Sequence, residues 1–344
     1  MKVVIEELGD RRLVFTASSI DGAVVNALRR VVIAEVPYVA ATAAETTFFE
    51  NTGVLHNHFI ADRVEMIPIH LTRVEVDAYI PSSIKVHLDV RNDGKLPRDV
   101  TSGDFTVTLH DRPHPEAARL YPTSSDGDHV LLTVLKPGER LRLESVVTKG
   151  VGHARYASVS TCAFSPVLDP ALVVERAAAA VTDREKNRFE HIDRKRCWRP
   201  GPDGNAREFR FILEAESGLS PREVVESAMS VLLRKCTTAE PIVIDSSTGA
   251  DGVVITVIEV AGEGHTLGNL LQSGAVDELL EDGAPLKYVG YVCPHPLEKR
   301  VHFKVVADGD PLASFEAMRR VAVERLTELQ HLLSEEFARD LGSS

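Results

Sequence analysis

A glycine-rich segment late in the chain comes closest to nucleotide chemistry. The segment GEGHTLGN contains three glycines, Gly262, Gly264 and Gly268. A phosphate-binding loop needs the closing Lys-Ser/Thr of a P-loop or the spacing GxGxxG, and this segment has neither. We therefore favour a tight strand-to-helix turn, with His265 or Thr266 as the helix N-cap and with Gly268 and Asn269 allowing close packing. A stand-alone nucleotide-binding protein or enzyme that uses this turn is the alternative.

Histidines and cysteines are the candidate metal ligands. His56 and His58 would point to one side of a strand, but no third ligand lies nearby in the sequence. The cysteines form no CxxC pair, which argues against a zinc site and a disulfide framework and indicates a reducing compartment. They are Cys162, Cys197, Cys236 and Cys293. Because no Asp-x-Asp-x-Asp motif occurs either, we expect no catalytic residue, no metal and no cofactor.

The charge distribution restricts the partners. The net charge is −12, and residues 251–344 hold 8 Lys and Arg against 16 Asp and Glu. Nucleic-acid binding depends on clustered cations, so we expect no direct contact with nucleic acid. The basic run at 192–199 is interpreted as a solvated loop. No apolar run approaches the length of about 18 residues that a membrane helix needs, so no membrane contact is expected.

The first part of the chain predicts a strand hairpin, a helix and then many strands. Residues 2–7 and 11–17 are β-type runs on either side of a Gly-Asp turn. A helix is expected over 20–36, ended by Pro37. Its apolar face includes Val24, Leu28 and Val31. Residues 44–160 are rich in strand patterns, such as those at 84–92, 104–110 and 129–135, and are interpreted as an inserted β-rich subdomain.

A strand at 207–217 and a helix at 220–236 follow. Ser220, Pro221 and Glu223 have the spacing of a capping box, in which a side-chain oxygen and a carboxylate satisfy two free amides. The buried stripe of this helix includes Val225, Ala228 and Leu232. A polar stretch over 241–252, with an edge strand at 241–245, is interpreted as a linker.

The last part predicts a compact unit of strand, helix, two strands and a long helix. The strands are expected at 253–260, 286–293 and 300–307, and the first helix at 266–281. The long helix, capped by Asp310, keeps an apolar stripe through Met318, Leu326 and Leu329 over about 40 Å. One small sheet cannot cover that length, so we expect a second partner, most simply a pair of helices. Both parts are α+β.

Several motifs together resemble a pair of polymerase subunits. NALRRVVIAEVP, NTGVLHNHFIADRVEMIPI and KGVGHARYASVS are similar to the alpha-type assembly subunit of multisubunit RNA polymerase, of the archaeal D and eukaryotic third-subunit type. GEGHTLGNLL and YVGYVCPHPLEKRV look like its small partner, the archaeal L or eukaryotic eleventh subunit. The resemblance covers residues 1–340 in family order. The arrangement of both parts in one chain resembles the fused, single-chain version of this pair in nucleocytoplasmic large DNA viruses.

The resemblance implies a non-catalytic platform for the two largest polymerase subunits, with small N- or K-like subunits as further partners. It implies D-like residues 1–43 and 161–240, an insertion at 44–160, a linker at 241–252 and an L-like domain at 253–344. The helices would form a four-helix interface within the chain. Its predicted residues are those named above on the helices at 20–36, 220–236 and 310–340, together with Leu267 and Leu271.

The resemblance also assigns surface roles. The residues expected to face the catalytic subunits are Asn26, Arg29, Arg30, Asn51 and Arg63. The prolines at 294 and 296 fix the backbone on either side of His295, so Pro294, His295 and Pro296 are expected to form a rigid structural turn. Many D-type chains carry a cysteine cluster, but residues 70–100 contain no cysteine, which again predicts no metal. The expected location is intracellular and reducing: viral factory, host nucleus or virion if the source is viral. A free transcription regulator that borrowed the platform is a third possibility.

Overall fold

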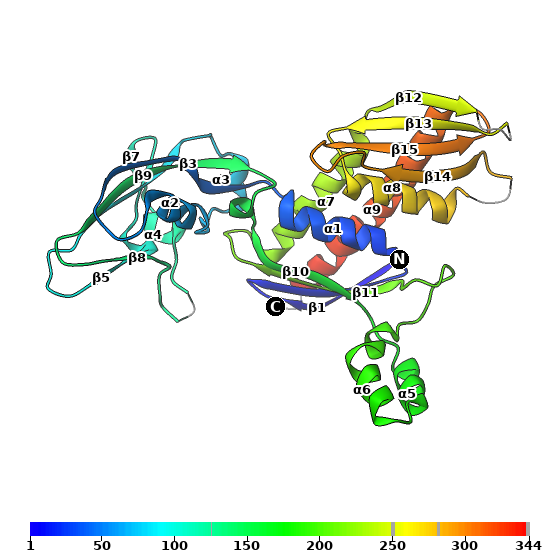
Figure 1. The fold of residues 1–344 in the computed structure, drawn as a ribbon, viewed down its shortest axis with the longest axis horizontal. Coiled ribbons are helices and arrows are strands. Elements are labelled where there is room, and N and C mark those ends of the chain that lie inside the picture. The colour runs from blue at the N-terminus through cyan, green and yellow to red at the C-terminus, as the bar shows by residue number, and fades with distance from the viewer. Residues whose placement is uncertain (125, 249–251, 281–282, 342–344) are drawn as a thin grey trace. The chain divides into compact units, whose positions relative to one another are not determined.

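The fold is taken from a computed structural model that describes residues 1–124, 126–248, 252–280 and 283–341 (Figure 1). Contacts divide the chain into two compact units. The first unit comprises Met1–Val31, Thr161–Leu213 and Val225–Ser344, and the second comprises Val32–Ser160 and Glu214–Val224. The predicted domain bounds stay a prediction. The predicted helix end at 281, part of the linker and residues 342–344 lie outside the described residues.

The first unit contains a four-stranded sheet whose strands come from two segments far apart in the chain. The strand order is β1-β2-β11-β10. The bounds are β1 Lys2–Leu8, β2 Arg12–Ser18, β10 Val159–Pro166 and β11 Glu208–Ala215. The predicted hairpin is confirmed, because β1 and β2 pair antiparallel. Phe15 and Phe211 stack in its core, with ring centroids 5.0 Å apart. Helices α1 (Gly22–Ala34) and α7 (Pro221–Thr237) confirm the two predicted helices.

A second four-stranded sheet lies in the same unit, with the order β12-β13-β15-β14. Its strands are β12 Pro241–Thr248, β13 Val254–Ala261, β14 Leu286–Val292 and β15 Arg300–Ala307. The expected edge strand after Pro241 is therefore confirmed, and it is longer than predicted because it pairs along β13. Helix α8 (His265–Glu278) follows β13, and α9 (Pro311–Leu341) follows β15.

The two sheets share one topology. In each, an antiparallel hairpin precedes a short helix, the other two strands follow, and a longer helix comes last. Asn26 and Asn269 each lie four residues after the first residue of their helix, and Leu28 and Leu271 lie six residues after it. The chain thus contains one structural plan twice, although its letters show little repetition.

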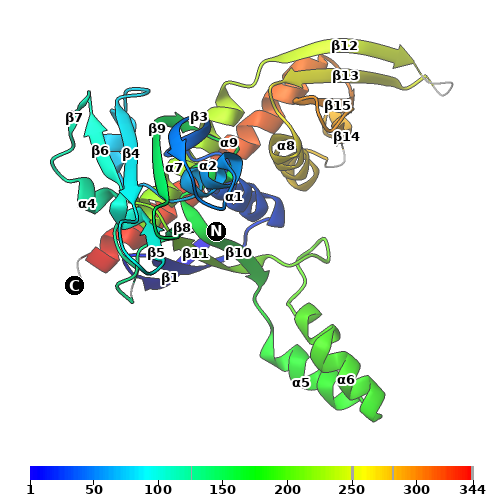
Figure 2. The ribbon, with the colours of Figure 1, turned by 60° about the vertical axis from the view of Figure 1, so that its left-hand side comes forward.

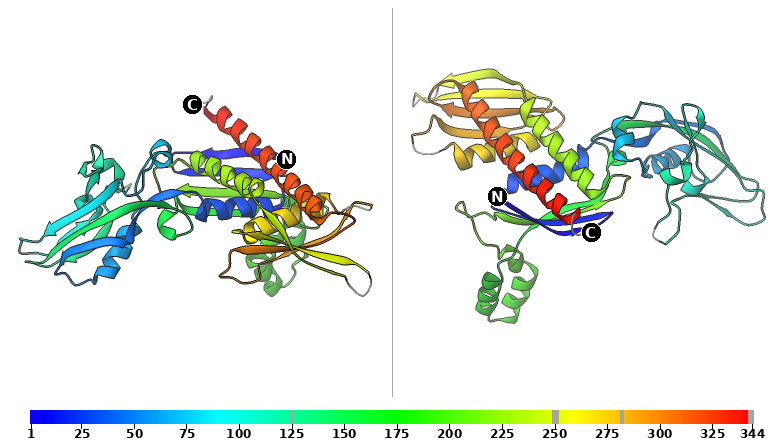
Figure 3. Two further views of the ribbon diagram at one scale, coloured as in Figure 1. Left: turned by 90° about the horizontal axis from the view of Figure 1, so that it is seen from above. Right: turned by 180° about the vertical axis from the view of Figure 1, so that it is seen from behind.

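Helix α9 contacts both sheets. It packs on β15 and α8, and it also contacts β1 of the other sheet. Figure 3 shows it leaving the sheet β12–β15 and reaching β1. The amino group of Met1 lies 3.0 Å from a carboxylate oxygen of Glu328 on this helix. Neighbouring elements therefore cover the apolar stripe of α9. One of them is the strand β1, whereas the sequence predicted a pair of helices.

The helix caps show one confirmed and one wrong prediction. Ser220 and Glu223 form the predicted reciprocal bonds at the start of α7, at 2.8 and 3.3 Å. In contrast, the N-cap of α8 is Gly264, and neither His265 nor Thr266 caps the helix. Gly264 has the extended backbone of an N-cap (φ −150°), and no side-chain bond replaces the missing hydroxyl.

A helical pair between β10 and β11 was not predicted. Its helices are α5 Pro170–Ala179 and α6 Asp183–His191, followed by a 3₁₀ turn at Asp193–Arg196. Figure 2 shows the pair extending away from β10 and β11. Thr182 and Glu185 form a capping box at the start of α6. The predicted solvated loop at 192–199 is thus partly this 3₁₀ turn.

The second unit is built on the five-stranded sheet β3-β9-β4-β6-β7 and the pair β5-β8. The strands are β3 Tyr38–Asn51, β4 Ile84–Arg91, β5 Arg98–Thr101, β6 Thr106–Leu109, β7 Arg112–Pro113, β8 Leu131–Leu135 and β9 Arg140–Gly150. The short helices are α2 Asn57–Glu65, α3 Arg73–Asp77 and α4 Ala117–Leu120. The predicted strands at 84–92, 104–110 and 129–135 are confirmed with shorter bounds, whereas these helices were not foreseen.

Buried Tyr38 organises part of this unit. Its hydroxyl donates to the carbonyl of Ile69 at 2.7 Å and accepts from the amide of Gly218 at 2.9 Å. Burial raises the pKa of Tyr38. Across the part of the chain that the structure describes, no helix is both long and apolar enough to span a lipid bilayer.

Candidate assembly interface

The residues predicted to form the internal helix interface are all buried. None of their side chains is more than 1% exposed. They are Val24, Leu28, Val31, Val225, Ala228, Leu232, Leu267, Leu271, Met318, Leu326 and Leu329. Burial is what either an interface or an ordinary core requires, so their assignment to an interface stays a prediction. The polar contacts in the first unit give more specific information.

Two hydrogen bonds join α1 and its flank to α8 in a reciprocal way. Arg30 lies eight residues after the start of α1, and its Nε donates to Oγ1 of Thr266 at 3.0 Å. Ser273 lies eight residues after the start of α8, and its Oγ donates to a carboxylate oxygen of Asp21. Each helix therefore uses the same position to bind the beginning of the other, as in an isologous contact.

Two ion pairs repeat this reciprocity on the long helices. Lys235 Nζ lies 2.8 Å from Oε2 of Glu263, just before α8. Arg325 lies 4.0 Å from Oδ2 of Asp21, just before α1. All four side chains are at most 16% exposed, so solvent screens these pairs less than it screens surface pairs.

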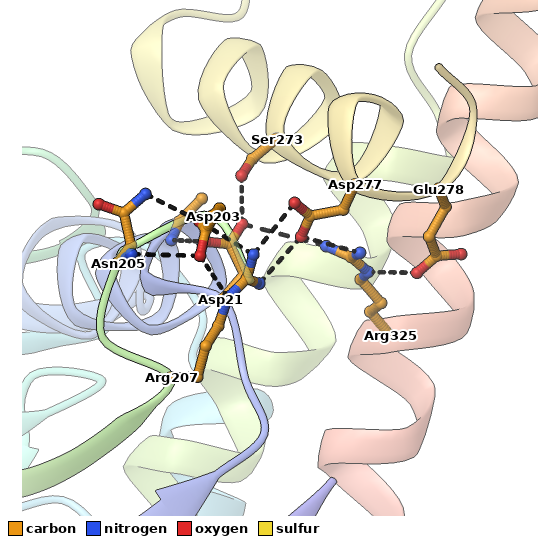
Figure 4. A network of polar contacts seen from close by, with 9 residues as sticks. Asp21, Asp203, Asn205, Arg207, Ser273, Asp277, Glu278 and Arg325 are labelled. Carbon is orange, nitrogen blue, oxygen red and sulfur yellow. Dashed lines mark hydrogen bonds and ion pairs between the residues drawn. The ribbon is translucent and has the colours of Figure 1, made fainter. Parts of the chain in front are cut away.

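A network of charged side chains extends from Asp21 (Figure 4). Arg207 binds Asp277 in a bidentate manner, with N–O distances of 2.9 and 3.1 Å. The same carboxylate accepts from Arg325 at 3.2 Å, and Arg325 also binds Glu278 at 2.7 Å. Asp203 holds Arg207 from the other side, at 3.1 Å. The planar guanidinium groups suit such paired contacts.

The network shifts the titration of its members. Burial alone would raise the pKa of Asp277, but hydrogen bonding and attraction to Arg207 and Arg325 outweigh it and hold the pKa below its ordinary value. The hydrogen bond from Asn205 lowers the pKa of Asp203, and Arg207 lowers it further. The pKa of Arg207 is raised, chiefly by its hydrogen bond with Asp277. All three groups are therefore charged at neutral pH.

Glycines on α8 allow close packing. A Cβ at Gly274 would lie 3.2 Å from Cγ1 of Val321 on α9. A Cβ at Gly268 would lie 2.5 Å from the ring of Tyr291 on β14, closer than real Cβ atoms approach. Asn269 occupies the following helical position. Gly268 therefore leaves room for the ring of Tyr291, and the packing role of the glycine segment stays a prediction.

The residues predicted to face the catalytic subunits lie on both units. Asn26 is half-buried and accepts from Arg29 at 3.1 Å, one turn along α1. Asn51 donates to Leu55 O and to Oδ1 of Asn57, at 2.9 and 2.7 Å, and so organises the loop before α2. Exposed Arg63 donates to Leu131 O at 3.1 Å. Their contacts with another chain stay predictions.

The histidine pair does not lie on a strand. His56 is the N-cap of α2 and accepts from the amide of His58, and the two rings stack 5.1 Å apart. Both line an open hollow of about 550 Å³ with Phe48 and Asn57. Within the described ranges, no three His, Cys, Asp or Glu side chains gather into a group able to hold a metal ion.

The thiols and the proline turn show no reactive arrangement. Burial raises the pKa values of Cys162 and Cys236 to about 12, so both thiols stay protonated at neutral pH. Pro294–Pro296 lie between β14 and β15, where Nδ1 of His295 accepts from the amide of Leu297 at 3.2 Å. This histidine orders its own turn.

The sequence did not indicate the Arg207–Asp277–Arg325 network. Its members lie on a strand flank, a short helix and a long helix, far apart in the chain. The available signals were an arginine directly before a β-type run and an aspartate on the polar face of a helix, and neither is specific.

The repeated plan defines a class of protein, an α+β fold in which one topology occurs twice. Two models of the RNA polymerase Rpb3/Rpb11 dimerisation domain match the chain, one over residues 14–236 and the other over residues 256–335. The chain belongs to this family, whose members are non-catalytic assembly subunits of DNA-directed RNA polymerase.

Individual relatives agree with this membership. The chain is 29% identical over 197 residues to the DNA-directed RNA polymerase II subunit rpb3 of Dictyostelium discoideum, covering 53% of this chain and 63% of that protein. It is 27% identical over 277 residues to subunit 3 of DNA-directed RNA polymerases II, IV and V of Arabidopsis thaliana, covering 74% and 82%. It is 25% identical over 286 residues to human RPAC1 of DNA-directed RNA polymerases I and III, covering 68% and 82%. The chain thus spans less than two thirds of the Dictyostelium protein.

Proposed function

We propose that this chain is a non-catalytic assembly platform of a DNA-dependent RNA polymerase, in which the D-like and L-like parts pair within one chain. The two long helices and the two short ones would form the four-helix interface. The observation that carries the proposal is the reciprocity of the contacts: Lys235 with Glu263, and Arg325 with Asp21. Contacts of this kind are expected between two partners that meet about a two-fold axis.

Covalent linkage suits this role. A short tether replaces association between two chains by association within one, at an effective concentration on the order of a millimolar. It also fixes equal amounts of the two parts. In this proposal residues 44–160 form an inserted subdomain of the D-like part, and β12 belongs to the connection between the parts.

The platform would dock the two largest polymerase subunits, with small N- or K-like subunits as further partners. Arg29 and Arg63 are candidate contacts because guanidinium groups bind carboxylates in pairs and stay charged. Arg30 has a second role within the chain through its bond to Thr266. The acidic net charge of −12 supports a position away from the nucleic acid.

Affinity purification of the tagged chain from its native source tests the proposal. We expect the two large catalytic subunits in stoichiometric amounts. Recovery of the chain without them would refute the platform and favour a free regulator. Arg29→Ala should reduce this recovery and should change the melting temperature little, because the guanidinium of Arg29 hydrogen-bonds to Asn26 one turn back on the same helix.

The nucleotide-binding alternative is not favoured. Gly264 and the glycines around it form a strand-to-helix turn, and the segment carries no lysine to reach a phosphate. Equilibrium dialysis of the isolated chain with nucleoside triphosphates decides the matter, since micromolar affinity would overturn the platform. We further propose a viral source of the fused type and an intracellular, reducing location, on the basis of the fusion and of the unpaired cysteines.

A further inference from the structure

The reciprocal ion pairs are almost symmetric, so they do not by themselves select the partner. If two D-like parts paired in the same way, Lys235 of one would approach Asp21 of the other. This encounter brings opposite charges together, so the ion pair of Lys235 would tolerate a pair of two D-like parts.

One ion pair between the D-like and L-like parts has no symmetric counterpart. Arg207 directly precedes β11 and binds Asp277, which lies 12 residues after the start of α8. The corresponding positions in the repeated plan are Lys299, directly before β15, and Ala34, 12 residues after the start of α1. Alanine carries no charge that a lysine could bind, so these two residue types cannot form the symmetric ion pair.

The environment of this contact makes its loss costly. Arg207 is 24% exposed and Asp277 is 20% exposed, so both charges are partly removed from water. In a pair of two D-like parts, Arg207 would face Ala34 of the second copy and would keep only Asp203. Leaving a partly buried charge without its partner disfavours that pairing.

Resting on the proposed function, we infer that Arg207 and Asp277 are the specificity determinants by which the D-like part accepts the L-like part rather than a second copy of itself. The competing partner is thus another molecule of this chain, and the contact keeps the chain closed on itself. The choice between the two partners depends on the carboxylate of Asp277 on α8, because the equivalent residue of α1 is Ala34.

Moving that carboxylate tests the inference. The double variant Ala34→Asp/Asp277→Asn places the acid on α1, where Ala34 is exposed, and removes it from α8. The matched control, Ala34→Asn/Asp277→Asn, has the same shapes without the charge. Each full chain is unfolded in urea and refolded over a range of concentrations, and its self-association constant is measured by sedimentation equilibrium.

We expect the double variant to self-associate about tenfold more strongly than its control, the ratio for one charge-assisted contact of about 1.4 kcal/mol. Asp277→Asn alone should self-associate more than the unmodified chain, but less than the double variant. Equal constants for the double variant and its control overturn the inference, provided that circular dichroism shows both chains folded. A misfolded control is replaced by Ala34→Gln/Asp277→Asn.

Capture of large polymerase subunits, measured on the same preparations, separates the two hypotheses. If the unmodified chain captures no such subunits but the association constants shift as expected, the platform fails and the pairing rule stands. If the subunits are captured and the constants do not shift, the platform stands and the pairing rule fails.

Discussion

Lys235 and Arg325 occupy the same position in two different helices. Each lies 14 residues after the proline that begins its helix, Pro221 for α7 and Pro311 for α9. Each approaches a carboxylate just before the short helix of the other part. Glu263, the partner of Lys235, lies two residues before α8, and Asp21, the partner of Arg325, lies one residue before α1. The two parts of the chain therefore repeat a charged contact as well as a topology.

Removal of one cation should destabilise the chain. Lys235→Met keeps most of the apolar stem but leaves Glu263 without its ammonium partner, so we expect a loss of about 2 kcal/mol in the free energy of unfolding. Urea denaturation measures it. The control is Lys287→Met, whose side chain is 42% exposed and pairs with Asp308, which is 74% exposed; its loss should stay below about 0.5 kcal/mol. Equal losses would contradict the distinction.

A charge in the stripe of α9 should be severe. Leu326 is fully buried, and Leu326→Asp should lower the free energy of unfolding by more than about 3 kcal/mol because an unpaired charge loses its hydration. Thr327→Asp, one position along on an exposed face, serves as the control. Thermal unfolding compares the two, and an unchanged melting temperature for Leu326→Asp would show that the assigned face is wrong.

A change at Thr266 separates the two roles proposed for Arg30, one within the chain and one toward a catalytic subunit. Thr266→Val removes the hydroxyl that Arg30 binds and keeps the shape, so it should cost about 1 kcal/mol of stability. Recovery of the large subunits should be unaffected, because the guanidinium remains. Arg30→Ala should lower both quantities. If Thr266→Val alone abolished recovery, the arginine would act only within the chain.

A close backbone contact in the second unit predicts a strong effect of a small change. A Cβ at Gly218 would lie 2.4 Å from the carbonyl oxygen of Leu71, which is backbone and cannot rotate away. Gly218→Ala should therefore cost about 1–3 kcal/mol. Gly9→Ala is the control, because its Cβ would lie 3.7 Å from the carbonyl oxygen of Arg12, an ordinary van der Waals distance. Differential scanning calorimetry checks the difference, and similar melting temperatures would argue against the contact.

Acid should weaken the charged network at Asp277. The pKa of Asp277 lies below its ordinary value of 3.8, so its ionisation stabilises the fold fully above that value. The contribution is lost as the pH falls through the folded-state pKa. We expect the unmodified chain to exceed Asp277→Asn in stability at pH 7, and the difference to shrink as the pH falls below about 4. A difference independent of pH would contradict the assignment.

The local signals in the sequence predicted most elements of the first unit. Ser220 and Glu223 specify the start of α7 because their bonds form within one turn, and the spacing of Met318, Leu326 and Leu329 specifies the buried face of α9. The family motifs led to the correct class of protein. The second unit was harder: α2 and α3 are short helices within a strand-rich region, where tertiary packing overrides weak propensity.

The sequence alone determined which residues are apolar, where the long helices begin and which family the chain joins, because these depend on neighbours along the chain. Only the tertiary structure decided which charges meet. Arg207, Asp277 and Arg325 come from separate elements, and their pairing depends on distances of a few ångströms across the fold. The tertiary structure also shows that the N-cap of α8 is Gly264 and not His265 or Thr266. The sequence could not show this, because cap geometry depends on the backbone that enters the helix.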